Sequence, residues 1–484
     1  MTLNLEHVCR AAAAGPRDSA TQQVGYSFYM PTFPWHKFHE LRWYAVLAMT
    51  VATFSAAAMY NPLVPVAIFI IVSGILVVAF SHQNLRVGIG VLGAIAAVIL
   101  IPTLNTPLPP FAGMLCGGLW AAAVASTAGR TPRASITYNM FVVVLALGLG
   151  GSILAPSFPW LAIVVSAFTI FMGYIAKSMN HAEWILVQRG LIILGIVEAL
   201  LCGYETLVLG SRISGSLTGG AHPILAGAVR AEGTLGHPLV AGMVMLAALA
   251  ITLASSISLR WKSVSTVLLL AGIFACGSSS VYIAAALTLF LGYIGSGSIP
   301  AKVIKSVVAG GCCLYLLLAP SILDPITTDV SGVNSTHRIN SIIAFPRLFT
   351  ERPLVQSLLG SGWGTAKENY QAGYLINDNF FSVDNQFTTV MMACGLLGLL
   401  LFVAAVAVTL RQTHPTSRPA LFTLTFMFFS FDVLSWGATA VLFIVLAVHT
   451  HSSSPKEVQP LHRAVIRVPT VPSKKTPALR QQTK

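Results

Sequence analysis

Long apolar stretches alternate with short polar ones along most of the chain. A helix that crosses a membrane needs about 20 mostly apolar residues. Segments that approach this length lie near residues 41–59, 62–80, 86–103, 110–128, 136–154, 158–176, 185–209, 239–257, 264–278, 281–296, 303–322, 386–410, 419–434 and 436–449. The pattern predicts an all-α polytopic membrane protein with about fourteen transmembrane helices.

The composition supports a membrane protein over a soluble one. The chain has 484 residues, of which 55% are hydrophobic and 9% are charged, whereas soluble domains carry about 25% charged residues. Its seven cysteines lie mostly inside apolar segments, and the long polar loops contain none, so we expect no disulfide framework and no CxxC metal site. The first forty residues lack an apolar core of signal-peptide length, and we expect the first helix to direct its own insertion.

The basic residues predict an orientation, because Lys and Arg accumulate in short cytoplasmic loops. With the N-terminus inside, 22 of the 28 basic residues lie in inner segments or near the inner end of a helix. We therefore expect a multi-pass protein of the cytoplasmic (inner) membrane with both termini in the cytoplasm. The expected parts are a cytoplasmic segment 1–40, helices 1–7 (41–209), outer loop 210–238, helices 8–11 (239–322), a large outer loop 323–385, helices 12–14 (386–449) and a basic cytoplasmic tail 450–484.

The net charge of +13 follows from this distribution together with the basic tail. Such a tail fits either a topology anchor or a contact with anionic lipid. No interleaving of basic and aromatic residues suggests nucleic acid. The expected partner on these grounds is the lipid bilayer.

Six basic residues fall on the outer side, against the prevailing rule. They are Arg212, Arg230, Arg338, Arg347, Arg352 and Lys367. Arginine suits phosphate because its planar group offers paired N–H donors, so these residues are candidates for binding a lipid diphosphate. The alternative is ion pairing within the loops, where Asp324, Asp329, Glu351, Glu368 and Asp378 offer partners.

The first outer loop contains the pattern His-Pro-x-x-Ala-Gly-x-Val twice, at His222 and at His237. Proline suits the first turn of a helix, so each copy is able to start one. A histidine in this position is either a helix cap or a group at the edge of a site. The polar residues Arg230, Glu232 and Thr234 lie between the two copies.

Several motifs in order resemble the O-antigen ligase and polymerase family of membrane glycosyltransferases. The first is Arg230, then Gly-Thr, then His237-Pro leading into a span. The family's late outer loop begins with an arginine, passes a G-x-G turn and ends in His-Asn or Asp-Asn before a span with GLLG. This chain has HRINSIIAFPRLF with Arg338, then LLGSGWG, then VDNQFTTVMMACGLLG with Asp384. The resemblance covers roughly residues 205 to 410.

The resemblance implies roles for particular residues. Arg230 and Arg338 would bind the diphosphate of a polyprenyl-linked glycan, Asp384 would be the catalytic base, and His237 would lie at the edge of the site. The family often has an arginine where this chain has Val281, so that contact is missing or supplied elsewhere, with Arg212 a candidate. Arg347 is a further candidate for substrate binding.

Carboxylates near the ends of the spans are open to two interpretations each. Asp384 is either the N-cap of the span after it, since Asp caps helices well, or the base that deprotonates an acceptor hydroxyl. Glu205 and Asp432 are expected at the outer level, in reach of the acceptor or of the large loop. Glu198 lies near the middle of a span, where an unpaired charge is costly, and is expected to have a buried structural partner.

The leading prediction is an inverting, metal-independent enzyme without a cofactor. It would polymerise or ligate polyprenyl-diphosphate-linked oligosaccharide units on the outer face of the membrane, in exopolysaccharide or other cell-surface glycan synthesis. Its partners would be the glycan donor, a glycan acceptor and other assembly proteins. A ligase differs only in the acceptor. One alternative is a flippase, although residues 41–209 and 239–449 show none of the repeat symmetry that is common in transporters. The other is a scaffold for an assembly machine.

Overall fold

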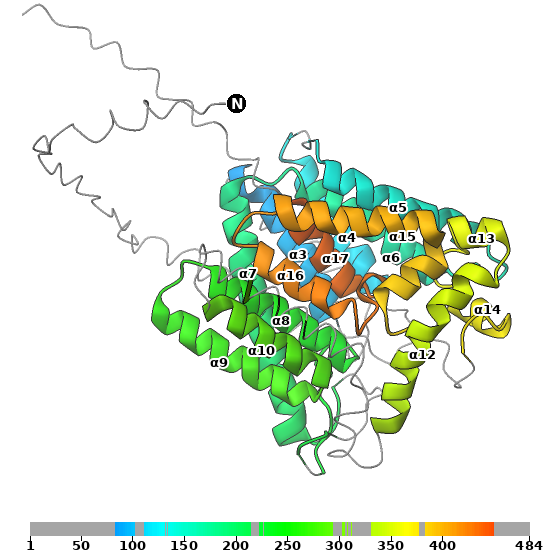
Figure 1. The fold of residues 1–484 in the computed structure, drawn as a ribbon. Helices are drawn as coiled ribbons and strands as arrows, with labels where there is room; N and C mark the ends of the chain where they lie inside the picture. Colours follow the sequence, from blue (N-terminus) through cyan, green and yellow to red (C-terminus); the bar gives the residue numbers. More distant parts are fainter. Residues whose placement is uncertain are drawn as a thin grey trace, which may run out of the picture. The chain divides into compact units, whose positions relative to one another are not determined.

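The computed structural model describes residues 83–101, 111–130, 132, 134–213, 222–225, 227–293, 303–304, 307, 311, 331–376 and 383–449, without the side chains of 111, 292–293 and 331–339. The chain divides into units 1–52 and 53–484, and all described residues belong to the second. Every helix and turn of this part is shown in Figure 1, and none of the described residues forms an extended strand.

The regular structure of the described part is helical, as the apolar pattern predicts. The α-helices are α3 (Arg86–Leu100), α4 (Phe111–Ser126), α5 (Ile136–Leu154), α6 (Trp160–Ala176), α7 (His181–Tyr204), α8 (Pro238–Ala254), α9 (Leu259–Cys276), α10 (Ser279–Tyr293), α12 (Ser331–Thr350), α13 (Leu354–Leu359), α14 (Ala366–Gln371), α15 (Gln386–Gln412), α16 (Arg418–Met427) and α17 (Gly437–Val448). A π-helical segment, Glu205–Leu209, extends α7, and short 3₁₀ segments lie at Gln83–Leu85 and Val433–Ser435.

Four of the helical stretches are long and apolar enough to cross a membrane: Gln83–Leu100, Ile136–Leu154, His181–Leu209 and Gln386–Gln412. Other apolar helices, α8 and α17 among them, are shorter than a full span. The predicted spans 41–59 and 62–80 lie outside the described residues, as does nearly all of 303–322.

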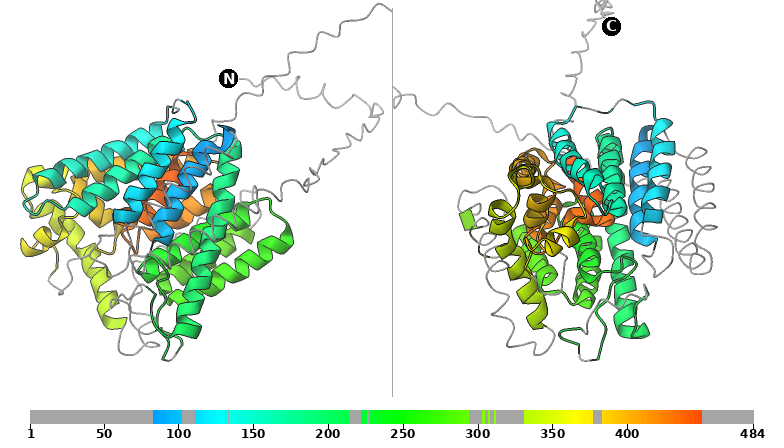
Figure 2. Two further views of the ribbon diagram at one scale, coloured as in Figure 1. Left: turned by 180° about the vertical axis from the view of Figure 1, so that it is seen from behind. Right: turned by 90° about the vertical axis from the view of Figure 1, so that its right-hand side faces the viewer.

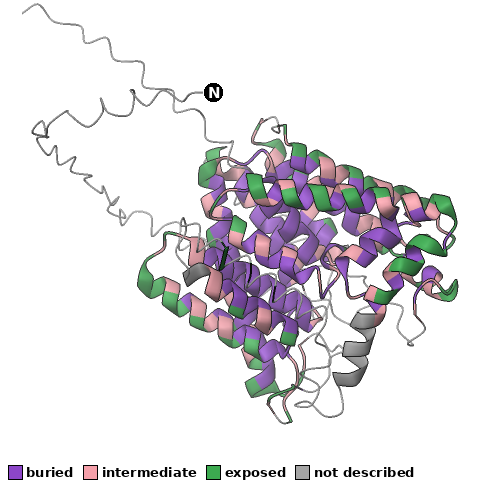
Figure 3. Cartoon of the chain, in the orientation of Figure 1, coloured by how far each residue is buried: buried purple, intermediate pink, exposed green. Residues whose placement is uncertain are grey.

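α8 and α17 form the centre of the packing. Every residue of α17 from Ala438 to Val448 is buried, and so are all residues of α8 from Pro238 to Thr252. Figure 3 shows these inner helices in the colour of buried residues, whereas α9 keeps a row of exposed side chains. A helix that is apolar on every side must be covered by protein or lipid, and here other helices cover both.

The helix ends gather into two groups, which we call the loop end and the opposite end. At the opposite end, Glu183 accepts hydrogen bonds from Val87 N at 2.9 Å and Asn180 N at 2.8 Å, and its carboxylate pairs with Arg130 at 2.6 Å. The other ends of these helices meet the connections that contain the predicted site residues.

The large predicted outer loop, 323–385, contains α12, α13 and α14. Figures 1 and 2 show these helices beyond the ends of α5 and α15, which run side by side. The turn after α13 enters between these two helices. There Gly362 N donates to Ala393 O at 2.9 Å, Trp363 Nε1 donates to Leu145 O at 3.2 Å, and Ser152 Oγ donates to Trp363 O at 2.9 Å.

The helix α15 is interrupted where this turn meets it. Gly395 has a φ of 65° inside α15, a left-handed conformation that glycine adopts without steric cost. A side chain at Gly395 would meet the backbone of Leu358 and Leu359. The G-x-G turn and the GLLG motif are therefore used for close packing between α13 and α15.

Candidate functional site

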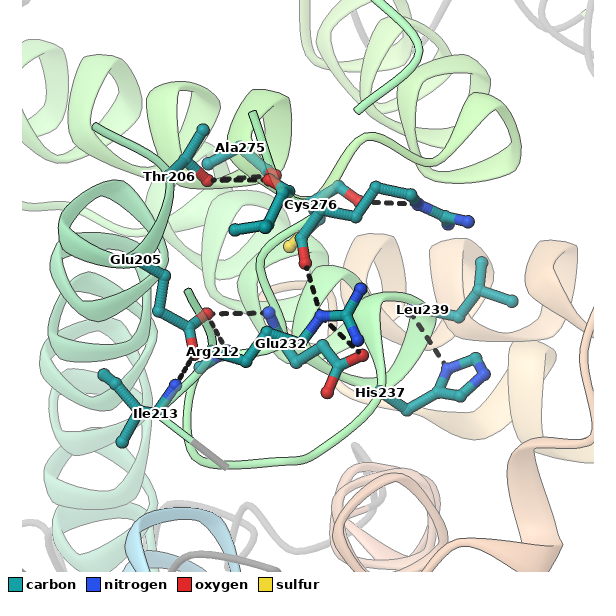
Figure 4. Close-up of polar contacts among 12 residues, drawn as sticks. Glu205, Thr206, Arg212, Ile213, Glu232, His237, Leu239, Ala275 and Cys276 are labelled. Atoms are coloured by element: carbon teal, nitrogen blue, oxygen red, sulfur yellow. Dashed lines mark hydrogen bonds and ion pairs between the residues drawn. The ribbon is translucent and has the colours of Figure 1, made fainter. Parts of the chain in front are cut away.

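Glu205 anchors the connection between α7 and α8 to the end of α7. Its Oε1 accepts a hydrogen bond from Ile213 N at 2.6 Å, and its Oε2 accepts from Glu232 N and Gly233 N, each at 2.8 Å. Figure 4 shows this carboxylate surrounded by the loop backbone. The carboxylate is fully buried and both its oxygens are bound by the loop, so these contacts give Glu205 a structural role and do not support its predicted role in substrate binding.

Arg212 is paired with a carboxylate of the same connection (Figure 4). Its Nε lies 3.4 Å from Glu232 Oε1 and also 3.4 Å from the carbonyl oxygen of Arg230. The Glu232 side chain is fully buried and Arg212 is nearly so. The ion-pair alternative therefore holds for Arg212, although its partner is Glu232 instead of the acids of the later loop.

Arg230 lies between the Arg212 ion pair and His237. Its Nε lies 3.4 Å from the carbonyl oxygen of Cys276, at the end of α9. Its positive charge acts on His237, where it helps to lower the pKa of the imidazole. The side chain is half-buried. Of the predicted arginines, Arg230 is the one that the described structure brings close to a predicted catalytic residue.

His237 both caps α8 and faces the other connections at the loop end. Its Nδ1 accepts a hydrogen bond from Leu239 N at 3.2 Å, and Pro238 fills the first helical position. Its ring packs against Phe431 and Trp436, at centroid distances of 5.5 and 5.0 Å. Burial lowers the pKa of His237 to about 4, with a contribution from the Arg230 charge, so the ring is neutral at pH 7. In contrast, His222 stabilises a turn and starts no helix.

The cap of α15 is Asn385, and Asp384 has a different position. Asn385 Oδ1 accepts hydrogen bonds from Phe387 N at 3.0 Å and from Thr388 N at 3.1 Å. Its Nδ2 donates to Phe429 O at 3.3 Å. Asp384 precedes the cap and is partly exposed, and no described residue donates a hydrogen bond to its carboxylate. The interpretation of Asp384 as the helix cap is wrong, because the next residue fills that position.

The connection between α16 and α17 brings a second carboxylate, Asp432, to the site. The predicted span 419–434 is corrected here, because α16 ends at Met427 and residues 428–436 do not continue it. Gln386 N donates to Phe428 O at 2.9 Å, and Leu434 N donates to Gln386 Oε1 at 2.7 Å. These bonds fix the connection against the start of α15.

The surroundings of Asp432 include Asp384. Burial raises the pKa of the Asp432 carboxyl to about 7. The charge of Asp384 also raises this pKa, whereas a hydrogen bond from Ser435 and the nearby Thr389 hydroxyl lower it. The charge of Asp384 thus reaches the Asp432 carboxyl. Sequence reasoning placed Asp432 at the outer level, in reach of the acceptor or of the large loop. The signal available in the sequence was the segment SFDVLS, whose polar residues interrupt an apolar stretch.

The arginines of α12 and the turn after it differ sharply in their surroundings. Arg347 is half-exposed and forms an ion pair with Glu351 at 3.9 Å, one helical turn away. Arg352 is only 5% exposed, and its Nη2 donates to Met392 O at 3.3 Å. Its Nε and Nη1 have no hydrogen-bond acceptor among the described residues. Arg338 lies on α12, but its side chain is outside the described part.

Arg352 is the residue whose importance the sequence analysis most underestimated. Burial lowers its pKa to about 10, and Tyr374 partly offsets this, so the guanidinium stays charged at pH 7. A buried charge without a counter-ion is costly. An anion bound to its two remaining N–H groups would satisfy it, and paired donors of this kind suit phosphate.

Two further predictions concern buried positions. Glu198 is fully buried and binds Thr234, whose amide N lies 3.3 Å from its Oε2 and whose hydroxyl contacts both Glu198 and the carbonyl of Ile99. The expected structural partner of Glu198 is thereby confirmed. Val281 is buried against Gly242 of α8, so this position offers no cation in place of the family's arginine.

The structure thus brings three connections together at the loop end. His237 and Arg230 come from the connection between α7 and α8, Asp384 from the segment before α15, and Asp432 from the segment between α16 and α17. The ring contacts of His237 and the hydrogen bonds of Asn385 join them. Among the described side chains, no group of three or more His, Cys, Asp or Glu residues is arranged to hold a metal ion.

Comparisons with known proteins add no assignment to this geometry. No protein-family model matches the sequence, and a search of curated proteins finds no significant match.

Proposed function

We propose that the protein is a membrane glycosyltransferase that acts on polyprenyl-diphosphate-linked oligosaccharides. The observation that carries the proposal is the convergence of Asp384, Asp432 and His237 from three separate connections at the end of an apolar helical body. The lipid tail of such a donor would remain in the bilayer. Its diphosphate and sugar would lie at the level of these connections.

The reaction needs a base, and Asp384 is the candidate. The acceptor hydroxyl attacks the anomeric carbon of the donor sugar, and its proton passes to the Asp384 carboxylate. The bond between that carbon and the diphosphate oxygen breaks, and the polyprenyl diphosphate leaves with the electron pair. Attack opposite the leaving group inverts the anomeric carbon. Asp384 suits this role because it is partly exposed and no described residue donates a hydrogen bond to it.

The departing diphosphate needs positive charge nearby. Arg230 lies beside His237, and Arg338 is placed on α12, so both remain proposed diphosphate-binding residues. Arg352 joins them because two of its buried N–H groups have no acceptor in the described part. It contacts α15 at Met392, seven residues after Asn385, which is about 10 Å along a helix. Arg212 and Arg347 are weaker candidates, since each is paired with a glutamate.

Polymerase and ligase differ in the acceptor, and both remain open within this proposal. Growth of one lipid-linked chain on another would be polymerisation in exopolysaccharide synthesis. Transfer to a different lipid, protein or wall acceptor would be ligation. The competing proposal is a flippase. It would need charged groups through the core, but α8 and α17 contain no charged residue. The buried carboxylate of Glu198 on α7 is bound by Thr234, which favours chemistry at the loop end.

The proposal is tested with the full chain in nanodiscs and a polyprenyl-diphosphate oligosaccharide from the native host. Products are separated by length for the parent and for Arg230→Ala, Arg338→Ala and Asp384→Asn. A ladder of products that each substitution abolishes is the expected result for a polymerase. A single product that appears only with another acceptor indicates a ligase. Movement of labelled donor across the bilayer without any transfer would overturn the proposal in favour of a flippase.

A further inference from the structure

The short helix α13 has the polarity of a helix that does not face water. Ser357 is the one buried residue within its bounds, at 2% exposure, and the Ser357 hydroxyl donates to Arg352 O at 3.3 Å. Leu354 and Val355 are 72% and 68% exposed, and Leu359 is exposed as well. A helix on the surface of a soluble protein buries its apolar side chains and turns its polar ones outward. Because α13 does the reverse, we expect its surroundings to be apolar.

The exposed apolar side chains of α13 form a group, which we call the α13 patch: Leu354, Val355 and Leu359. They make up half of this six-residue helix, and Val355 and Leu359 lie one helical turn apart, so they share a face. Phe349, at the end of α12, is half-exposed as well. Single exposed apolar residues are normal, whereas a group of them marks a contact with a partner or a membrane.

The α13 patch lies next to the apolar outer surface of α15, which is long enough to cross a membrane. The backbone of Leu358 comes so close to α15 that a side chain at Gly395 would meet it. Just beyond this contact, Leu397 and Leu400 of α15 are exposed. Figure 3 shows exposed residues both along α15 and on α13. Exposed apolar residues on a helix of this length are suited to contact with lipid.

The same surface continues on α5, the second long apolar helix that the turn after α13 contacts. A Cβ on Gly151 would lie 2.5 Å from Gly362 N, so the turn and the end of α5 touch. The residues of α5 that follow this contact, Ile153 and Leu154, are 60% and 85% exposed. The α13 patch therefore has lipid-compatible surface on both of its neighbours.

We infer that α13 lies in the lipid bilayer, in the leaflet next to the loop end, with the α13 patch among the acyl chains. The partner is lipid because the exposed apolar residues of α5 and α15 already require it, and the patch extends their surface. The last turn of α12 limits this surface, since Arg347 and Glu351 are half-exposed there and form an ion pair. Charged side chains beside an apolar face suit the boundary between headgroups and acyl chains.

This position has a consequence for Arg352, which is two residues before Leu354. With the α13 patch in the acyl region, Arg352 would lie near the level of the headgroups. The diphosphate of a polyprenyl-linked donor lies at the same level, since its lipid tail is in the bilayer. That consequence rests on the proposed function, whereas the position of α13 does not.

The experiment uses the full chain in phosphatidylcholine vesicles, with an environment-sensitive fluorophore attached to Val355→Cys. Its emission should be shifted to shorter wavelength relative to Ala372→Cys, an exposed position directly after α14. A nitroxide on the lipid acyl chains should quench it, as it should quench Leu400→Cys on α15. Leu354→Cys is a second reporter for the patch. The labelled parent chain gives the background from the native cysteines.

Two results would overturn the inference. Emission equal to that of Ala372→Cys, with quenching by iodide in the water and none by the lipid nitroxide, would place the patch in water. Emission at shorter wavelength that neither quencher reduces would mean that a protein, for example a second copy of this chain, covers the patch. No step of the measurement involves glycan transfer, so a failure of the proposed function is distinguishable from a failure of this inference.

Discussion

Asp384 and Asn385 are adjacent, and the sequence does not show which of them caps α15 and which is free to act as a base. Either side chain is able to cap a helix, and the motif Asp-Asn does not say which one does. The structure shows Asn385 bonded to Phe387 N and Thr388 N. The carboxylate before it is thereby released from the cap, and this separation makes a functional role for Asp384 testable apart from stability.

Asn385→Ala should destabilise the protein by about 1 kcal/mol, because it leaves the first amides of α15 without an acceptor. Asp384→Asn should change stability by less than half of that and should abolish glycan transfer. Thermal unfolding in detergent and the transfer assay measure the two effects. Equal destabilisation by both substitutions, with transfer reduced in parallel, would contradict the division of roles.

Arg352 poses a related question. Within the described part its guanidinium donates one hydrogen bond, to Met392 O, and this bond does not recover the stability that burial of the charge costs. Arg352→Met should therefore unfold at an equal or higher temperature than the parent. Its affinity for the lipid-linked donor should fall, because hydrogen bonds to charged groups contribute about 1.5–3 kcal/mol, or roughly tenfold to hundredfold. Donor titrations followed by tryptophan fluorescence measure this loss.

Arg347→Met is the control for Arg352, since Arg347 is half-exposed and paired with Glu351. Exposed ion pairs contribute little, so both its stability and its donor affinity should match those of the parent. A loss of affinity in Arg347→Met with none in Arg352→Met would reverse the order of the two arginines and would restore the original sequence-based assignment.

Among the elements, the turn Gly360–Gly364 shows how a short motif is used for packing. Its backbone lies against α5 so closely that a Cβ on Gly151 would stand 2.5 Å from Gly362 N. The turn also bonds to α15 through Ala393 O. The motif thus joins α5, α13 and α15.

Gly151→Ala should destabilise the protein by about 1–3 kcal/mol, because the added methyl group overfills a close contact with backbone on both sides. Gly150 is the matched control on the same helix, since a Cβ there meets nothing within 4 Å. Gly150→Ala should be neutral or stabilising, as alanine is favoured over glycine in helices by about 0.5–1 kcal/mol. Similar unfolding temperatures for the two variants would contradict this account of the turn.

Sequence reasoning found the helices more readily than it found their ends. The apolar pattern located α5 at 136–154 and placed the start of α15 at Gln386, both as observed. It missed the break before Asp432, because the apolar residues on both sides of SFDVLS continue the hydropathy of a span. It also could not show that Arg352 is buried, since burial depends on how α12 and α13 pack on α15.

At the scale of the whole molecule, the contacts sort the helix ends into two groups, the loop end and the opposite end. The proposed donor lipid and its acceptor both require the loop end to face outward. Lys and Arg in the short connections predict that orientation. The site and the orientation are therefore linked, and one labelling experiment tests both.

Ala372→Cys and Ser126→Cys each place one new thiol at an exposed position, the first directly after α14 at the loop end and the second at the end of α4. In right-side-out vesicles, a membrane-impermeant maleimide should label Ala372→Cys and leave Ser126→Cys unlabelled, and inside-out vesicles should give the reverse. The parent chain is the control for its own cysteines, four of which are buried. If Ser126→Cys were labelled from outside, Asp384 and Asp432 would face the cytoplasm, and transfer would require a donor that has not yet crossed the membrane.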